Sequence, residues 1–211
     1  MKEYHKINSL YKRDMSKRQA PFIIGDYAEP EFELLKDINW EWTEKIDGTN
    51  IRIQLSKEGV EFGGRTDSAQ IPAHLFKRLQ EIFTEERLHE VFQGEWDNIC
   101  LYGEGFGNKI QGKVGIDYLK DDVDFIIFDV MVGDLYLERK NIEDIASKLG
   151  IKAVPIVNKG TINEAITYIK TNPKSLIGNA EMEGLVLRPE YELKNRRGGR
   201  IITKIKYRDF K

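Results

Sequence analysis

The stretch from Trp40 to Ile53 places a lysine where an apolar strand meets a tight polar turn. Its first six residues are typical of a strand, and from Asn50 onward apolar and polar side chains alternate with the period of a half-buried strand. Asp47-Gly48 between them is a hairpin signal. Lys45 is therefore predicted at a strand end, beside a glycine whose backbone can approach a ligand closely. An ordinary surface lysine before a turn would have the same Lys-x-Asp-Gly sequence, so this motif alone does not indicate a function.

The composition is that of a globular protein with a proper core. The 211 residues are 40% hydrophobic and 32% charged, and no apolar run is long enough to cross a bilayer. The N-terminus lacks the apolar core of a signal peptide, so we expect a cytoplasmic protein. The single Cys100 excludes an intrachain disulfide and a cysteine zinc cluster. We expect one domain over residues 1–211, acting as a monomer.

Basic residues gather at both ends of a chain whose net charge is only -2. Residues 194–211 contain eight lysines and arginines and one acid, and the first twenty residues contain six bases and two acids. This distribution disfavours coating of nucleic acid by bulk charge and indicates localised phosphate contacts. Solvated tails would give the same pattern, and for the N-terminal segment that alternative stays open.

Strand-like segments recur along the chain, with helices inserted between them. Further strands are expected at residues 60–62, 99–102, 123–132, 135–137, 183–188 and 201–207. Helices are expected at residues 30–37, 72–83, 88–92, 141–149 and 162–170. A capping box, Thr161 with Glu164, begins the last of these helices. Strands joined mostly by hairpins predict an α+β fold with mainly antiparallel sheets and inserted helices.

Six polar clusters follow these strands in a fixed order. They are Glu44-Lys45-Ile46-Asp47-Gly48-Thr49-Asn50, Arg65, Tyr102-Gly103-Glu104, Phe125 to Asp129, Glu183 to Arg188, and Lys204-Ile205-Lys206. The order resembles the covalent nucleotidyltransferase superfamily of ATP-dependent ligases and capping enzymes, whose motifs are Lys-x-Asp-Gly, Gly-Glu, aromatic-Asp, Glu-Gly-x-Val and Lys-x-Lys. One four-residue motif recurs by chance, whereas six in order, across about residues 40–206, make a specific match.

Within that superfamily the chain looks most like the phage-type RNA ligases. Glu44 precedes the lysine and Asn50 follows it by five residues, where DNA ligases usually have an arginine close behind the core motif. Arg65 and Arg188 stand where the family carries basic residues. The resemblance implies a nucleotidyltransferase (ATP-grasp-like) adenylation domain and an ATP-dependent RNA ligase. AMP would pass from ATP to Lys45 and then to a 5'-phosphate end, and a 3'-hydroxyl would displace it.

The catalytic residues expected from this resemblance also suit the chemistry. Attack on the α-phosphate of ATP needs a neutral amine, whereas a free lysine is almost wholly protonated at neutral pH. Lys204, Lys206 and a bound Mg²⁺ would favour the neutral amine of Lys45 and neutralise charge on the phosphate and pyrophosphate oxygens. Glu183 is the expected metal ligand, because Mg²⁺ takes only one or two carboxylates. The solvent face of an edge strand gives the same lysine pair.

The other residues of the nucleotide site are implied by the resemblance. Four of them are Glu44, Asn50, Arg65 and Arg188. Glu104 would accept a hydrogen bond from the ribose hydroxyls. Phe128 would stack on adenine, with Phe125 as the alternative, because alternation puts the two on opposite faces. At least one of these two rings is expected in the core.

Three other functions stay open. A DNA ligase is disfavoured by Glu44 and Asn50, and a capping guanylyltransferase by the few residues after Lys206, which leave no room for a C-terminal oligonucleotide-binding domain. A non-catalytic nucleotide- or RNA-binding module is disfavoured by the intact set of lysines. In place of that domain, we expect residues 194–200 and the N-terminal bases to hold RNA. The expected partners are RNA with 5'-phosphate and 3'-hydroxyl ends and an end-healing kinase or phosphatase.

Overall fold

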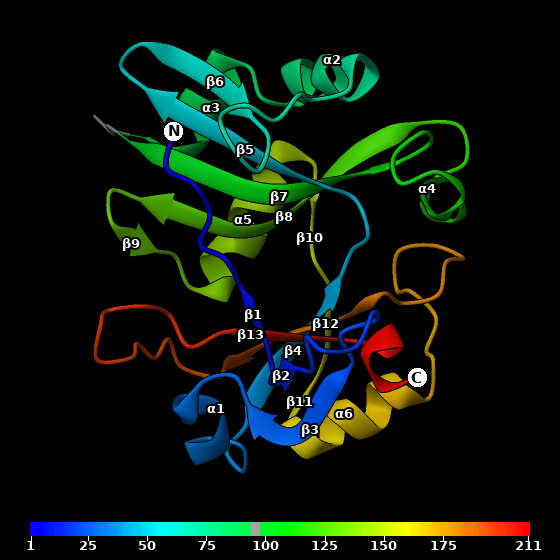
Figure 1. Cartoon of the computed structure of the whole chain (residues 1–211). Coiled ribbons are helices and arrows are strands. Elements are labelled where there is room, and N and C mark those ends of the chain that lie inside the picture. The colour runs from blue at the N-terminus through cyan, green and yellow to red at the C-terminus, as the bar shows by residue number, and fades with distance from the viewer. Residues whose placement is uncertain (94–97) are drawn as a thin grey trace. The chain divides into compact units, whose positions relative to one another are not determined.

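The computed structural model describes residues 1–93 and 98–211. The chain forms two compact units, each with its own sheet (Figure 1). Unit 1 comprises residues 1–5 and 47–154, and unit 2 comprises residues 6–46 and 155–211. The single domain expected for residues 1–211 stays a prediction. Among the residues described, no helix is both long and apolar enough to cross a membrane.

Unit 2 is built on a five-stranded sheet with the order β1-β13-β12-β4-β11. Its strands are β1 (Asn8–Ser9), β13 (Thr203–Lys206), β12 (Gly184–Pro189), β4 (Trp40–Lys45) and β11 (Ile156–Gly160). Both neighbours of β12 run antiparallel to it, and β1 pairs parallel with β13. A separate antiparallel ribbon joins β2 (Tyr11–Arg13) to β3 (Phe22–Tyr27).

One face of the unit 2 sheet is apolar and packs against α6 (Ile162–Lys170). The strand residues in this core include Trp42, Leu187 and Ile205. The capping box expected at the start of α6 forms: the Thr161 hydroxyl accepts from the Glu164 backbone, and the Glu164 carboxylate accepts from the Thr161 backbone. The short helix α1 (Pro30–Leu34) and the 3-10 helix η1 (Tyr207–Phe210) complete the unit. Because side chains alternate along a strand, the remaining strand residues lie on the other face.

Unit 1 is built on a six-stranded sheet, in which five strands follow the order β10-β8-β7-β5-β6 and the sixth, β9, pairs with β8. Its strands are β5 (Thr49–Ser56), β6 (Gly59–Gly63), β7 (Ile99–Gly107), β8 (Val123–Val132), β9 (Leu135–Tyr136) and β10 (Lys152–Ala153). Only the short pairing of β10 with β8 is parallel among these described strands. The α+β class with mainly antiparallel sheets is thereby confirmed.

Helices cover one face of the unit 1 sheet. These are α2 (Ala73–Ile82), α3 (Glu85–Val91) and α5 (Arg139–Leu149), while α4 (Lys113–Tyr118) follows β7. The core beneath them contains Ile51 and Ile53 of β5 and Val130 of β8. The alternate residues of β5 and β7 therefore lie on the face away from this core.

The prediction of a hairpin at Asp47-Gly48 is wrong. Both flanking strands form, but β4 pairs within the unit 2 sheet and β5 within the unit 1 sheet. The turn is instead held inside unit 1, where the Asp47 backbone donates to the Tyr118 hydroxyl and Gln111 donates to the Gly48 carbonyl. A Cβ on Gly48 would lie 2.3 Å from the carbonyl oxygen of Gly105. Glycine is needed here because the start of β5 passes so close to β7.

Candidate active site

The three predicted catalytic lysines share one face of the unit 2 sheet. Lys45 and Lys206 stand on either side of Gly184 in one cross-strand row, and Lys204 belongs to the neighbouring row through Val186. Residues directly opposite one another on paired strands point to the same face. This face is the one away from α6. Because Gly184 has no side chain, the middle strand puts nothing between Lys45 and Lys206.

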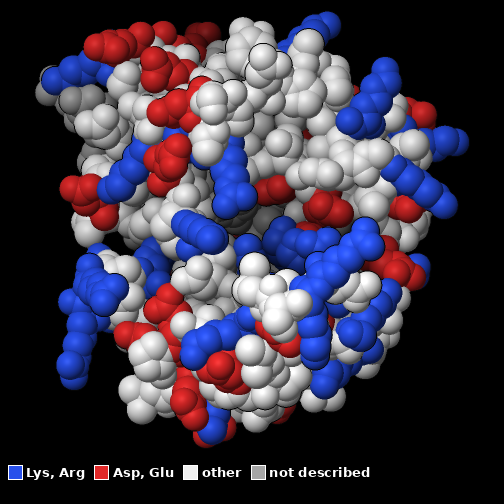
Figure 2. Space-filling view, viewed as in Figure 1, with Lys and Arg blue, Asp and Glu red and all other residues white. Residues whose placement is uncertain are grey.

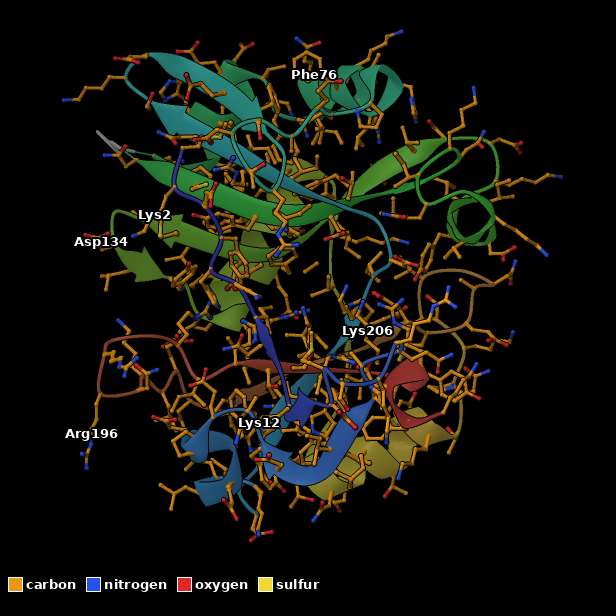
Figure 3. The ribbon with its side chains drawn as sticks, viewed as in Figure 1. Lys2, Lys12, Phe76, Asp134, Arg196 and Lys206 are labelled. Atoms are coloured by element: carbon orange, nitrogen blue, oxygen red, sulfur yellow. The ribbon has the colours of Figure 1, made fainter. Side chains whose placement is uncertain are left out.

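The Glu183 carboxylate joins two of these lysines (Figure 3 labels Lys206). Lys45 Nζ donates to Glu183 Oε2 at 2.7 Å, and Lys206 Nζ donates to Glu183 Oε1. The three side chains are between 14% and 23% exposed. Solvent therefore screens these charges only in part.

Two opposing effects act on the pKa of Glu183. Burial alone would raise it, but the charge of Lys45 and the hydrogen bonds from both lysines outweigh burial and hold the pKa below its ordinary value. Glu183 is accordingly ionised at neutral pH. The cluster carries one net positive charge while both lysines are ammonium groups, and no net charge once Lys45 has lost a proton. A neutral, nucleophilic Lys45 would thus leave a balanced Glu183–Lys206 pair behind it.

Glu183 is also the predicted metal ligand. Both of its oxygens accept hydrogen bonds from ammonium groups, so a bound cation would replace at least one of them. In residues 1–93 and 98–211, no group of three or more His, Cys, Asp or Glu side chains could hold a metal. A single carboxylate fits a hydrated Mg²⁺, which keeps most of its waters, and does not fit an all-protein cage.

Glu44 lies on the opposite face of β4 from Lys45. Its side chain is buried, and Oε2 accepts a hydrogen bond from the backbone of Leu176 at 2.8 Å. Burial raises the pKa of this carboxyl, with hydrogen bonds from Ser175 and Leu176 opposing the rise. Glu44 therefore fixes the loop at residues 175–176. Its contact with a nucleotide stays a prediction.

Arg188 lies on the lysine face, four residues along β12 from Gly184, a separation of about 13 Å. It stands directly opposite Glu41 of β4. On the neighbouring strand, Lys159 Nζ lies 3.9 Å from Glu41 and 3.1 Å from Glu190. Acids and bases are therefore mixed at this end of the sheet as well, where no single carboxylate joins two lysines of one row.

In unit 1, the structure brings three predicted residues onto one face. Asn50 and Glu104 stand directly opposite one another on β5 and β7. Phe128 of β8 packs against the same cluster as Tyr102, its ring 5.0 Å from that of Tyr4. The Asn50 Oδ1 atom is buried and accepts no hydrogen bond from the described residues. Such an atom fits a ligand that brings a donor to it.

The two phenylalanines of β8 differ as alternation predicts. Phe125 is 1% exposed and belongs to the helix-covered core, where its ring meets that of Phe83 edge to face. Phe128 lies half-buried on the other face. The expectation that at least one of them is a core residue is confirmed, and Phe128 remains the candidate for stacking.

Arg52 is fully buried, although the alternating pattern of its strand does not predict this. Its Nε donates to the carbonyl of Gly64 at 2.6 Å, and its Nη2 donates to Asp67 at 2.9 Å. These two contacts flank Arg65, which is exposed on the turn after β6. Alternation along β5 predicts a polar side chain at position 52 and nothing about its burial. The burial comes from Met1 and from the turn after β6, which cover that face of the strand. Arg52 therefore positions the turn that carries Arg65.

The basic segment at residues 194–200 is partly neutralised. The Arg200 guanidinium makes two hydrogen bonds to the Glu192 carboxylate, at 2.6 and 2.9 Å, and is 6% exposed. Arg196 instead projects away from the loop that carries it (Figure 3). The segment thus exposes fewer charges to a ligand than its sequence suggests.

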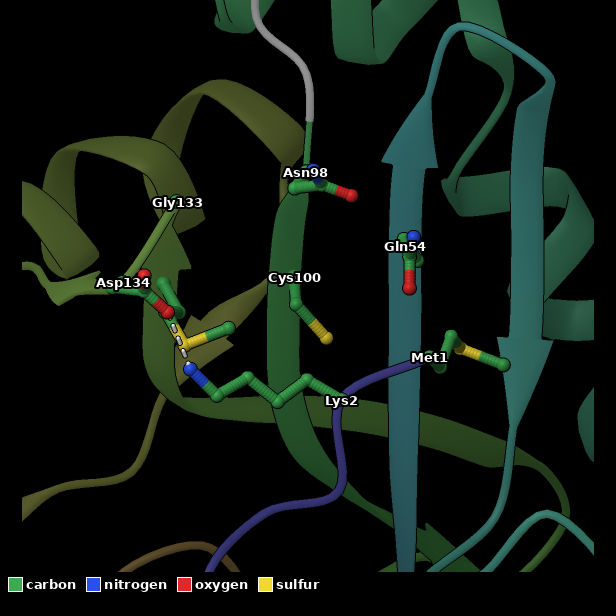
Figure 4. A pocket seen from close by; sticks show the side chains of 8 residues that line it. Met1, Lys2, Gln54, Asn98, Cys100, Gly133 and Asp134 are labelled. Atoms are coloured by element: carbon green, nitrogen blue, oxygen red, sulfur yellow. Dashed lines mark hydrogen bonds and ion pairs between the residues drawn. The ribbon is translucent and has the colours of Figure 1, made fainter.

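Unit 1 also contains a cavity of about 360 Å³ beside Cys100 (Figure 4). An ion pair between Lys2 and Asp134, 2.8 Å long, lies along one side of it. Burial raises the pKa of the Cys100 thiol. None of the catalytic or nucleotide-binding residues predicted from the sequence lines this cavity.

Two mainly antiparallel sheets and a lysine cluster at the end of a central strand define a nucleotidyltransferase fold of the RNA ligase type. The chain belongs to the RNA ligase family, whose model matches residues 38–206. No curated protein sequence gives a significant match.

Solved structures of Naegleria gruberi RNA ligase are similar. One with PPi has a TM-score of 0.65 and 23% identity over 86% of this chain and 53% of that chain. A variant with ATP and Mn has a TM-score of 0.66 and 20% identity over 99% of this chain and 58% of that chain. This likeness shows the fold, and the chain spans little more than half the length of these structures.

Proposed function

We propose that this chain is an ATP-dependent RNA ligase that works through a lysyl-AMP intermediate. The Lys45 nitrogen attacks the α-phosphorus of ATP, a P–N bond forms, and pyrophosphate leaves with the electron pair of the broken P–O bond while the amine loses its proton to solvent. AMP then passes to a 5'-phosphate, and a 3'-hydroxyl displaces it to join the strands. The observation that carries this proposal is the carboxylate that Lys45 and Lys206 share on one face of the sheet.

The neighbours of Lys45 take supporting roles. Lys206 and Lys204 neutralise charge on the phosphate oxygens, since electrostatic stabilisation is most of phosphoryl-transfer catalysis. Glu183 holds Lys45 in place and balances its charge. A divalent cation, which we propose to be Mg²⁺ bound at Glu183, would add charge neutralisation at the same oxygens. The Naegleria gruberi structures with ATP and Mn support the use of ATP with a divalent metal.

Other predicted residues are proposed to contact the nucleotide. In unit 1, Glu104 accepts from the ribose hydroxyls, Asn50 uses its unpartnered oxygen to accept a donor, and Phe128 offers a ring for stacking. Arg65 is exposed and available to a phosphate. In unit 2, the further candidates are Arg188 and Glu44.

The test is covalent labelling of the protein by α-labelled ATP with Mg²⁺, run in parallel with α-labelled GTP. We expect label from ATP only, and none in Lys45→Ala or Lys45→Arg, because a guanidinium stays protonated. Lys159→Ala is the matched control, because Lys159 lies on the same sheet but pairs with other acids. Wild-type labelling in either Lys45 variant, or label from GTP alone, would overturn the proposal.

Substrate choice is tested with a nicked duplex. The two nucleotides on the 3'-hydroxyl side are switched between ribose and deoxyribose, because the 2'-hydroxyl is what separates RNA from DNA there. Faster sealing of the ribose nick is expected. Equal rates would favour a DNA ligase, and labelling without any sealing would favour a module that needs a partner to join ends.

A further inference from the structure

Charge alone does not mark a binding surface on the face of the protein seen in Figure 2. Lysine and arginine side chains are interspersed with acidic ones over the visible surface (Figure 2). Several N-terminal bases are already paired with neighbouring acids: Lys12 with Asp26 at 2.7 Å, and Lys17 with Asp14 at 3.3 Å. A phosphate site therefore has to be found from a cavity and from the charges that face it.

Unit 2 has such a cavity, of about 390 Å³, beside the edge strand β1. Three cations line it, Lys6, Arg13 and Lys204, with the polar side chains of Asn8 and Ser9. No carboxylate is among the described lining residues. Two acids that do not line the cavity each accept a hydrogen bond from one lining residue: Glu29 from Asn8, and Asp209 from Arg13.

Two of the three cations of this cavity, Arg13 and Lys6, differ in what holds them. Arg13 is fixed by Asp209 at 2.8 Å and by the carbonyl of Ala20 at 3.1 Å, and it stacks over the Phe22 ring. Arg13 is thus held in place on one side of the cavity, and Asp209 balances its charge. Lys6 is exposed and makes no hydrogen bond or ion pair with a residue in the described part of the chain. Lys6 is thus the cation most available to a ligand.

The cavity continues the lysine face of the sheet. Ser9 of β1 stands in register with Lys204 of β13. Lys204 is two residues from Lys206, about 6.6 Å along the strand and on the same face. In the strand order β1-β13-β12-β4, the β1 residues that line the cavity lie three strands from Lys45, about 14 Å at the usual strand spacing, and Lys204 lies two strands from it. This separation suits phosphates further along a polynucleotide better than the tail of a nucleotide held at Lys45.

We propose that this cavity binds a backbone phosphate of the RNA strand, with Lys6 as its charged contact, while Lys204 at its border keeps its proposed role at the phosphate oxygens of the nucleotide. The inference rests on the proposed function and adds a place where the strand is held. It also divides the basic N-terminal segment: Lys6 serves the ligand, whereas Lys12 and Lys17 are neutralised locally.

The experiment compares Lys6→Ala with Lys12→Ala in RNA binding. A fluorescein-labelled single-stranded RNA with a 5'-phosphate is titrated without ATP, by anisotropy, over a series of salt concentrations. Loss of one phosphate contact on a single strand reduces the slope of log K against log salt by about 0.7. We expect this change and a several-fold weaker binding for Lys6→Ala, and a wild-type slope for Lys12→Ala. Lys6→Arg should restore binding. Circular dichroism checks that each variant is folded.

Three outcomes would overturn the inference. Unchanged RNA binding in Lys6→Ala would remove the contact, and equal losses in both alanine variants would show diffuse attraction without a site. A raised KM for ATP in lysine labelling by Lys6→Ala would assign the cavity to the nucleotide's phosphates instead. Failure of the wild-type protein to accept label from ATP would sink the proposed function, while the salt slopes would still decide on the cavity.

Discussion

Replacing Glu183 by its neutral isostere tests the lysine cluster most directly. Glu183→Gln keeps the size of the side chain but leaves the ammonium groups of Lys45 and Lys206 facing an uncharged amide. Removing one partner of a buried ion pair costs about 3–5 kcal/mol. Since the three side chains are 14–23% exposed, solvent screens part of this cost. We expect a loss of about 2–3 kcal/mol in the free energy of unfolding at neutral pH.

The pH dependence of this loss has a definite sign. The folded-state pKa of Glu183 lies below the ordinary value of 4.5. Its contribution to stability is therefore fully present above the pKa of the unfolded chain and is lost as the pH falls through the folded-state pKa. The variant lacks this titration. The stability difference between wild type and variant should stay constant from about pH 6 to 8 and shrink below about pH 4.5.

Urea unfolding followed by tryptophan fluorescence measures this difference, because Trp40 and Trp42 are buried in the core of the same unit. Labelling by ATP should fall about a hundredfold in the same variant. Glu190→Gln is the control: its side chain is 40% exposed and pairs with Lys159, so we expect a cost below about 1 kcal/mol and normal labelling. Equal stability of Glu183→Gln and wild type, or a difference unchanged at pH 3.5, would refute the ion-pair reasoning.

Two further predictions concern unit 1. Gly48→Ala should lower the free energy of unfolding by about 2 kcal/mol in urea melts, because its Cβ would lie 2.3 Å from a carbonyl oxygen, and wild-type stability would contradict this. Phe125→Ala should cost about 3–5 kcal/mol of stability with an unchanged KM for ATP, since the ring is a core residue. Phe128→Ala should cost less stability and raise that KM in labelling assays. If Phe125→Ala instead raised the KM for ATP and Phe128→Ala caused the larger loss of stability, Phe125 would be the stacking residue and Phe128 the core residue.

Local patterns predicted much of this structure because they depend on near neighbours in sequence. The strand at residues 40–45, the capping box that begins α6 and the opposite faces of Phe125 and Phe128 all follow from periodicity or from contacts within four residues. The fold class follows from the order of such elements.

Other features depend on partners far along the chain. The hairpin signal at Asp47-Gly48 is local, whereas β4 pairs with β11 and β12, more than a hundred residues away. β5 forms its local hairpin with β6 on its other side, and its second neighbour, β7, is more than forty residues away. Arg52 is buried by the N-terminus and the turn after β6, although its strand pattern predicts a polar, solvent-facing position. The short strands β1 to β3 contain two to six residues and carry little periodic signal.

The apolar face of the unit 2 sheet determines the geometry of its charged face. Trp42 and Leu187 are directly opposite each other and pack beneath α6, so a slip of β4 by one residue against β12 would turn Trp42 from the core to the opposite face. The same slip would carry Lys45 out of its row with Lys206 and away from Glu183. Burial of this pair therefore fixes the register, and the register brings two cations to one carboxylate. The position of Lys45 is specified by hydrophobic packing on the far side of its own strand.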